Sequence, residues 1–381
     1  MSAKTDSANL DFLRAYAVLT VYFGHALQVL HIEKTFGRVT IYDFAQTGVL
    51  IFFVHTSLVL MLSLDRLRST SCSRLFTVFY IRRAFRIYPL SIATVLVMLA
   101  ARAPAFPDLV YSRPRFLAVL SNLTLTQNLT RSGSYPAVLW SLPYEVQMYI
   151  VLPFLFVIVR RFSSSWLPIC LWAFDVAFIV VMWIVTPANA HEWLKGIPLV
   201  LQYTPCFLAG IIGYRLWSAT RRTLPFFGWP TVITSCVALR VLAGMTSIPH
   251  AATLSKWLAC LILGLTVSRF REVGSGWIRT FAAIIAKYSY GIYLGHSLAF
   301  WVAFILLRHT DLWIQGAVCL ALSILIPLAM YHGVEKPMIT VGLRLAAATG
   351  RSVAATATLD RSGTNGQVTD ALQAHEVTSY Q

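Results

Sequence analysis

Long apolar segments alternate with short polar ones along most of this chain. About 20 apolar residues let a helix cross the hydrocarbon core of a bilayer, and about ten segments reach that length. They lie at about residues 8–31, 45–64, 84–102, 139–159, 166–186, 198–217, 227–246, 252–270, 284–307 and 312–334. The pattern predicts an all-α, polytopic membrane protein with about ten transmembrane helices.

Two polar residues interrupt the first apolar segment, Leu10–His31. Arg14 and His25 are eleven residues apart. This is about 20° past three helical turns, so both side chains lie on one face, about 16 Å apart along the axis. A charged group in hydrocarbon is costly and usually lines a functional path. The pair therefore predicts a polar cavity enclosed by the helices.

Composition agrees with this class, because 57% of the residues are hydrophobic, 12% are charged and the mean hydropathy is +0.67. A soluble protein carries about 25% charged residues. The net charge is +16, and most lysines and arginines fall in loops on one side of the predicted membrane. The positive-inside rule places that side, with both termini, in the cytoplasm. Topology and contact with anionic membrane lipids explain the basic charge, so no nucleic-acid partner is expected.

From about Ala346 onward the chain is polar and rich in small residues. Such a composition cannot bury a core, so we expect a membrane domain at 1–345 and a disordered cytoplasmic tail at 346–381. The six cysteines are scattered and form no C-x-x-C pair. We therefore expect neither a metal site nor a disulfide framework.

An arginine cluster lies at the predicted start of the third span. Arg82, Arg83 and Arg86 fall within the run Tyr80–Leu90. They have the position of a simple positive-inside anchor. Three guanidinium groups at a helix start also suit the capture of phosphate, because each fork binds bidentately and the helix N-terminus adds positive potential. Both interpretations are open from these residues alone.

The fourth predicted span begins with an acidic residue, Glu145, within Trp140–Tyr149. A carboxylate in an apolar helix needs a partner, and we expect His25 to be that partner, oriented as the acid of a serine-protease triad orients its histidine. The alternative is an interfacial glutamate that reaches lipid headgroups.

Further histidines lie inside predicted spans. His55 falls in the second span, and His296 ends the run Tyr288–His296 in the ninth. Each suits either the wall of the same cavity or a hydrogen bond between helices. Since no P-loop or nucleophile-elbow motif is present, the candidate chemistry is proton transfer by histidine beside a bound anion. Asp175, Arg240 and His332 stay without an assigned role.

Six motifs in this order resemble those of the integral-membrane acyltransferases of family three, which modify bacterial surface polysaccharides, nodulation factors and macrolides. The resemblance covers about residues 8 to 340. Its motifs match at Leu10–His25, Gly48–Val54, Arg82–Pro89, Trp140–Tyr149, Ser289–His296 and Glu335–Pro337. One departure is His55–Leu58, where many relatives have isoleucine, serine, glycine and phenylalanine. That difference affects the expected choice of acceptor or acyl group more than the reaction.

The resemblance implies transfer of an acyl group, acetyl by default, from cytoplasmic acyl-CoA to a hydroxyl group. The implied acceptor is a carbohydrate or lipid-linked glycan, and the implied location is the bacterial inner membrane. In this hypothesis His25 is the general base, Glu145 supports it, and Arg14 positions the donor or stabilises developing charge. The implied coenzyme ligands are Arg82, Arg83 and Arg86, and the implied substrate pocket includes His55, Tyr149 and His296.

Two other classes compete with this interpretation. A transporter or flippase for a glycan precursor or small solute would use the same polar track, but it predicts inverted repeats, and none is evident. A glycosyltransferase acting on lipid-linked sugar would want acids in a large outer loop, and the predicted outer loop at 103–138 contains Asp108 alone. Acceptor identity, acyl chain length, the choice between direct transfer and an acyl-enzyme, and oligomeric state are open at this level.

Overall fold

The computed structural model describes residues 7–32, 35–36, 39–67, 71–107, 109–162, 164, 166–187, 192–217, 219, 222–225, 228–274 and 276–362. Within these ranges, nine helices are long and apolar enough to cross a membrane. They coincide with nine of the predicted spans. The remaining span corresponds to α1 (Ala8–Val29), which has 22 residues and carries Asp11, Arg14 and His25 among its apolar ones. The predicted all-α, polytopic class is confirmed.

The chain begins with α1, a two-residue antiparallel hairpin of β1 (Thr35–Phe36) and β2 (Val39–Thr40), and a long second helix. The helices that follow α1 are α2 (Ile41–Arg66), α3 (Cys72–Ala100), α4 (Phe116–Thr124), η1 (Ala137–Ser141), α5 (Leu142–Arg161), α6 (Leu167–Val185), α7 (Glu192–Leu201), α8 (Thr204–Trp217), α9 (Gly228–Met245), α10 (Ala251–Thr266), η2 (Val267–Arg269), α11 (Trp277–Phe300), η3 (Trp301–Leu306), α12 (Leu312–Met330), η4 (Tyr331–Glu335) and α13 (Lys336–Ser362).

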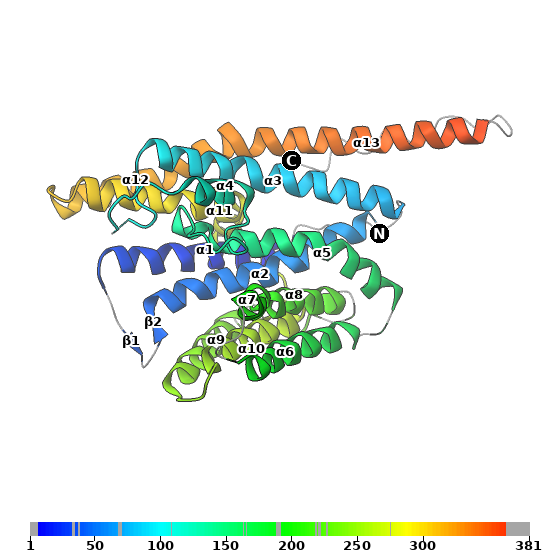
Figure 1. Ribbon diagram of the computed structural model, residues 1–381, viewed down its shortest axis with the longest axis horizontal. Coiled ribbons are helices and arrows are strands. Elements are labelled where there is room, and N and C mark those ends of the chain that lie inside the picture. The colour runs from blue at the N-terminus through cyan, green and yellow to red at the C-terminus, as the bar shows by residue number, and fades with distance from the viewer. Residues whose placement is uncertain are drawn as a thin grey trace.

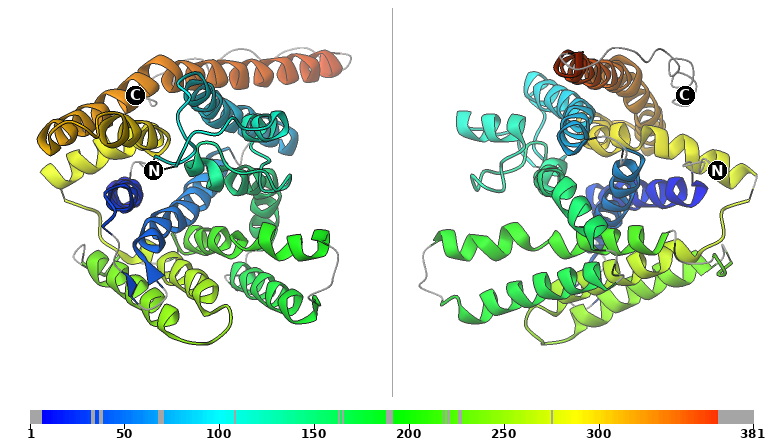
Figure 2. Two further views of the ribbon diagram at one scale, coloured as in Figure 1. Left: turned by 60° about the vertical axis from the view of Figure 1, so that its left-hand side comes forward. Right: turned by 90° about the vertical axis from the view of Figure 1, so that its right-hand side faces the viewer.

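The helices form three layers, with α1, α2 and α5 in the middle layer (Figure 1). Helices α3, α4, α11, α12 and α13 lie on one side of it, and α6 to α10 lie on the other, an order that both views in Figure 2 repeat. Leu13 of α1 and Val54 of α2 are completely buried. The first two helices are therefore the centre of the packing, and side chains on their inner faces meet groups from both outer layers.

Helices α1 and α2 approach each other so closely that their contact requires glycine. A Cβ atom at Gly48 would collide with the carbonyl oxygen of Ala17, and one at Gly24 would meet the Cβ of Ala45. Small residues allow this kind of backbone contact between membrane helices, where van der Waals packing drives association.

The third span differs from its prediction at its beginning. Helix α3 begins at Cys72, where the Ser71 hydroxyl accepts a hydrogen bond from the backbone N–H of Arg74 at 3.4 Å. It runs for 29 residues, so Arg82, Arg83 and Arg86 lie well inside it. The expectation that the N-terminus of this helix adds positive potential to the arginines is therefore wrong.

The predicted outer loop at 103–138 does not stay outside the bundle. Helix α4 runs beside α3 (Figure 1), and the hydroxyl of Tyr88 donates to the carbonyl of Thr124 at 3.3 Å. Tyr88 is twelve residues before the end of α3, or about 18 Å along the helix. The irregular backbone at this depth is satisfied internally, since the Asn122 amide donates to the carbonyl oxygen of Gly133 and accepts from the backbone N–H of Tyr135.

As a consequence, α5 begins deep inside the bundle. It follows η1 directly at Leu142 and runs 20 residues to Arg161. The first turn of α5, where the Leu142 N–H bonds to the Leu139 carbonyl and Pro143 has no N–H, therefore faces the interior of the protein and not an aqueous surface.

The chain remains helical beyond the predicted boundary at 346, because α13 continues to Ser362. Its sequence after Leu345 contains many alanines, which favour helix. Residues 363–381 lie outside the described residues, and the disorder of this end stays a prediction.

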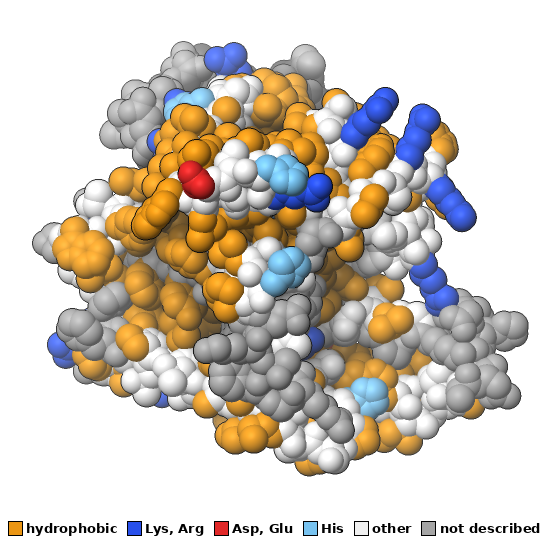
Figure 3. All heavy atoms as spheres, turned by 90° about the vertical axis from the view of Figure 1, so that its left-hand side faces the viewer, with side chains coloured by type: hydrophobic (Ala, Val, Ile, Leu, Met, Phe, Trp, Pro, Cys, Tyr) orange, Lys and Arg blue, Asp and Glu red, His pale blue; other side chains and the backbone are white. Residues whose placement is uncertain are grey.

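The outer surface of the bundle is largely apolar. Along the spans, exposed hydrophobic residues include Phe174, Ile184 and Leu320, and apolar exposure on this scale suits contact with lipid. Figure 3 looks at one end of the bundle, where hydrophobic and basic side chains are mixed.

Candidate active site

A cavity of about 90 Å³ lies where α1, α2, α3, α5 and α11 meet. Six of the residues predicted for the site line it, and they come from four of these helices. They are Arg14, His55, Arg83, Arg86, Glu145 and Tyr149. Sequence segments separated by up to 135 positions are thus assembled into one polar chamber, as the polar face of α1 predicts.

Arg14 enters this cavity from α1 and is held by a serine. Its Nε donates to Ser289 Oγ at 2.7 Å, and the serine hydroxyl donates in turn to the carbonyl of Ala286 at 2.8 Å. These two consecutive hydrogen bonds orient the guanidinium of Arg14, which lines the cavity.

The cavity holds more positive than negative charge. Arg86 forms an ion pair with Glu335, whose side chain is fully buried. Arg83 Nε is buried and has no hydrogen-bond partner among the described residues. Three guanidinium groups therefore face the two carboxylates of Glu145 and Glu335, and an uncompensated positive charge inside a protein is suited to an anionic ligand.

Arg82, the third member of the predicted arginine cluster, is not among the residues that line the cavity. Arg83 and Arg86 are three residues apart on α3 and share a helical face, whereas Arg82 is turned by about 100° from Arg83. The cavity thus brings together two of the three predicted coenzyme ligands.

Glu145 lies in the first turn of α5 and is bound within the cavity. The hydroxyl of Tyr149 donates to Glu145 Oε1, and the hydroxyl of Thr56 approaches the same oxygen at 3.4 Å. The predicted contact between Glu145 and His25 is wrong for the described residues. Because α5 begins deep in the bundle, Glu145 lies at the level of Arg14, and His25 is about 16 Å further along α1.

His25 contacts another histidine instead. Its Nδ1 lies 2.8 Å from His296 Nε2, the two rings stack at 5.1 Å between centroids, and His296 Nδ1 lies 3.0 Å from the carbonyl oxygen of Ile292. Both rings are buried, 6% exposed for His25 and 2% for His296. Neither histidine lines the cavity itself. We call these two residues the histidine pair.

Tyr293 connects the cavity to the histidine pair. It lines the cavity, and its ring centroid is 6.3 Å from that of His296. Its hydroxyl contacts Ser141 Oγ at 2.7 Å and donates to the carbonyl of Val138 at 2.7 Å. The histidine pair therefore lies next to the charged cavity along α11.

Three residues of this arrangement were given no role in the sequence analysis: Ser289, Tyr293 and Glu335. All three lie inside motifs that support the family resemblance, Ser289–His296 and Glu335–Pro337. Motif membership was the available signal, but it does not say which partner each residue meets.

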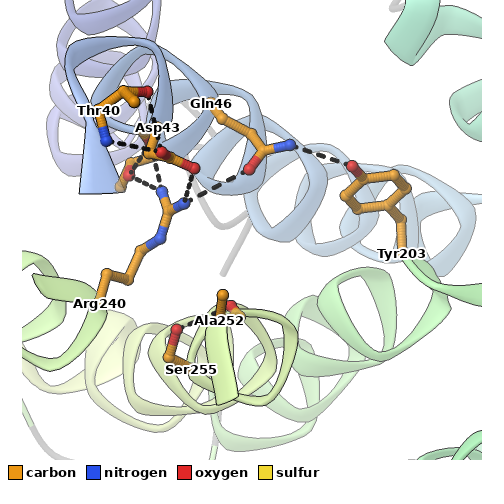
Figure 4. A network of polar contacts seen from close by, with 8 residues as sticks. Thr40, Asp43, Gln46, Tyr203, Arg240, Ala252 and Ser255 are labelled. Atoms are coloured by element: carbon orange, nitrogen blue, oxygen red, sulfur yellow. Dashed lines mark hydrogen bonds and ion pairs between the residues drawn. The ribbon is translucent and has the colours of Figure 1, made fainter. Parts of the chain in front are cut away.

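The unassigned polar residues make contacts that hold helices together. Arg240 donates to the backbone carbonyl of Asp43 and to the hydroxyl of Thr47, and it reaches the Asp43 carboxylate at 3.5 Å and Gln46 Oε1 at 3.4 Å (Figure 4). Gln46 continues the network to the Tyr203 hydroxyl at 3.1 Å. These bonds tie α9 to the first turns of α2.

The other two unassigned residues, Asp175 and His332, each contact one hydroxyl group. Asp175 accepts a hydrogen bond from Thr204 at 2.6 Å, and His332 lies 3.3 Å from the Tyr288 hydroxyl. Across the described ranges, no group of three histidine, cysteine, aspartate or glutamate side chains is arranged to hold a metal ion.

Comparison with known proteins assigns the chain to a family. The family model described as an acyltransferase domain matches residues 7–332, so the chain belongs to this family of acyltransferases, and the predicted resemblance is confirmed. The chain is also similar to Nodulation protein 10 of Rhizobium leguminosarum bv. viciae, with 27% identity over 355 residues that cover 82% of this chain and 89% of that protein. No solved structure matches.

Proposed function

We propose that this membrane acyltransferase moves an acyl group, acetyl by default, from cytoplasmic acyl-CoA to a hydroxyl of a sugar or lipid-linked glycan. The observation that carries the proposal is that the cavity with its three arginines and the buried histidine pair lie next to each other, joined by Tyr293. An anionic donor and a hydroxyl acceptor need these two kinds of group side by side.

The donor is assigned to the cavity on grounds of charge. The phosphates of a coenzyme A thioester are anionic, and guanidinium groups bind phosphate oxygens bidentately. Arg83, with its unpartnered Nε, and Arg86 are the proposed phosphate ligands. The narrow pantetheine arm then lies along α1 past Arg14, so that the thioester carbonyl points towards the histidine pair.

The reaction is a direct transfer with His25 as the base. The acceptor hydroxyl oxygen attacks the thioester carbonyl carbon while His25 takes the hydroxyl proton. The new C–O ester bond forms, the C–S bond breaks, and the thiolate leaves and receives the proton. Arg14, about 16 Å from His25 along α1, positions the donor in the cavity.

The acceptor and the membrane location rest on the family and the charge distribution. A nodulation protein among the relatives supports a glycan acceptor. Lysines and arginines gather in alternate loops, which supports cytoplasmic termini in a bacterial inner membrane. Donor and acceptor then arrive from opposite sides of the bilayer.

The test uses purified full-length protein in nanodiscs with radiolabelled acetyl-CoA and a set of candidate glycans. We expect His25→Ala to lower label transfer by about 100-fold or more. The matched control is His309→Ala, which changes an exposed histidine outside the cavity and the histidine pair. Normal turnover in the His25→Ala protein would overturn the mechanism. If folded wild-type protein neither binds nor consumes acetyl-CoA, the donor assignment fails and the transporter alternative gains support.

A further inference from the structure

We propose that His296 is a positioning residue that selects the ring tautomer of His25, so that His25 Nε2 carries the lone pair that accepts the substrate proton. This inference rests on the proposed function, because it assigns the base to one nitrogen of His25. It concerns a residue that otherwise would be grouped with the substrate pocket.

The assignment begins at a backbone carbonyl. The carbonyl oxygen of Ile292 can only accept a hydrogen bond, so His296 Nδ1, 3.0 Å away, must carry the proton. In a neutral imidazole the other nitrogen is then an acceptor, so His296 Nε2 is unprotonated. His25 Nδ1 lies 2.8 Å from it and must donate. The proton of neutral His25 is therefore on Nδ1, and its Nε2 carries the lone pair.

The surroundings make this order of donors hard to reverse. The ring neighbours of the pair are aromatic, and the ring centroids of Tyr22, Phe300 and Phe106 lie 5.5 to 6.3 Å from that of one imidazole or the other. The Tyr293 hydroxyl is engaged with Val138 and Ser141. Both imidazoles are nearly inaccessible to water, so reversing either ring would leave two acceptors facing each other at Ile292 or between the rings.

The arrangement also supports the charged intermediate. When His25 Nε2 takes the acceptor proton, the ring becomes an imidazolium whose Nδ1–H already points at a lone pair on His296. The hydrogen bond to the Ile292 carbonyl fixes the orientation of the His296 ring. His296 therefore acts on His25 and not on the substrate, which is the task that a buried carboxylate performs in a serine-protease triad.

Two substitutions at one position separate the two hydrogen bonds of His296. Glutamine places its amide oxygen near the position of Nε2 and accepts from His25 Nδ1–H. Asparagine is shorter, places its amide nitrogen near the position of Nδ1 and retains the bond to Ile292, but it does not reach His25. We expect His296→Asn to lower kcat by about 100-fold or more with KM for acetyl-CoA unchanged, and His296→Gln to recover to within about tenfold of wild type.

Equal activity of the two variants, or a loss that falls on KM alone, would overturn the positioning role. A role in packing alone predicts that the two amides behave alike. Thermal unfolding of both variants checks that folding is retained.

A second measurement does not depend on turnover. Nitrogen NMR of 15N-histidine-labelled protein in nanodiscs, with the His25 signals identified by comparison with His25→Ala, reports which ring nitrogen carries the proton. We expect protonated Nδ1 and unprotonated Nε2 in the wild type, and a changed tautomer in His296→Asn. Protonated Nε2 in the wild type would refute the inference. If wild-type protein transfers no acyl group from acetyl-CoA, the proposed function fails while this experiment still decides the tautomer.

Discussion

Arg14 and Arg240 lie inside the same helical bundle and are held in the same way, yet their surroundings differ. Each donates to a hydroxyl group, Ser289 for Arg14 and Thr47 for Arg240, and each hydroxyl donates to a backbone carbonyl of its own helix. Arg240 also lines a cavity, one of about 180 Å³, but its two terminal nitrogens are already bonded to a backbone carbonyl, a carboxylate and an amide oxygen as well. Arg14 opens into a cavity beside Arg83, whose Nε is unpartnered in the described part of the chain.

The number of hydrogen bonds that the protein itself makes to each guanidinium distinguishes a structural arginine from a ligand-binding one. Both types interrupt apolar helices, and their sequence contexts look alike. A guanidinium whose donors are consumed by the protein connects helices, whereas one whose donors remain available beside a cavity binds something else.

The largest effect is expected for Arg240→Met, and it should fall on stability. The methionine fills much of the volume but removes the guanidinium from the Asp43 carboxylate and carbonyl, which keep only their contacts with Thr40 and Thr47. Removing one member of such a network costs about 3 kcal/mol, less where water reaches the carboxylate. The thermal unfolding temperature, measured in one detergent, should fall by several degrees, while KM for acetyl-CoA stays as in the wild type. If KM rises and the unfolding temperature is unchanged, the two arginines do not differ in role.

The next effect is expected for Arg83→Ala, and it should fall on donor binding. A hydrogen bond to a charged group contributes about 1.5–3 kcal/mol, which corresponds to about 10- to 150-fold in KM for acetyl-CoA. Unfolding should change little because no hydrogen bond to described residues is lost from Arg83 Nε. Arg83→Lys is the matched control, which keeps the charge but loses the planar fork and should recover part of the affinity. An alanine variant with wild-type KM would remove Arg83 from the donor site.

The smallest effects are expected for a matched pair of hydroxyl deletions, Ser289→Ala and Thr47→Val. Each removes one hydroxyl from one buried arginine contact, at about 1–2 kcal/mol. The serine change should lower acyl transfer about tenfold with a small shift in unfolding, because Arg14 loses its orientation. The threonine change should lower the unfolding temperature by a few degrees and leave transfer intact. Acyl transfer and unfolding temperature are measured for both variants. If Thr47→Val lowers transfer and Ser289→Ala lowers only the unfolding temperature, the assigned roles are reversed.

Much of this architecture follows from the sequence because the bilayer imposes a length on apolar helices. The spans at 166–186 and 312–334 were identified from hydropathy alone, and the polar face of α1 predicted the cavity that Arg14 lines, although His25 lies outside it. Hydropathy does not reveal how deep a helix begins, however. Phe116–Thr124 is apolar enough to descend into the bundle beside α3, and its amide and hydroxyl partners come from later residues. That descent is what carries Glu145 to Arg14.

The pairing of buried polar groups was the least predictable part of the site. Periodicity tells which residues share a face of one helix, but not which residue on another helix meets them. His25 was expected to meet Glu145 and meets His296, and Arg86 meets Glu335, which is 249 positions later in the chain. Such contacts depend on the relative depth and rotation of helices, which packing of the whole bundle decides.

The glycine contact between α1 and α2 bears on how this protein can move. At Gly48 and Gly24 the two helices pack so closely that a larger side chain would collide with Ala17 or Ala45. Arg14 and His25 on α1 and His55 on α2 are therefore carried by one closely packed helix pair. A transporter that opens alternately to the two sides of the membrane would need to move at an interface other than the one between α1 and α2. An enzyme whose two substrates come to one site does not need such a movement.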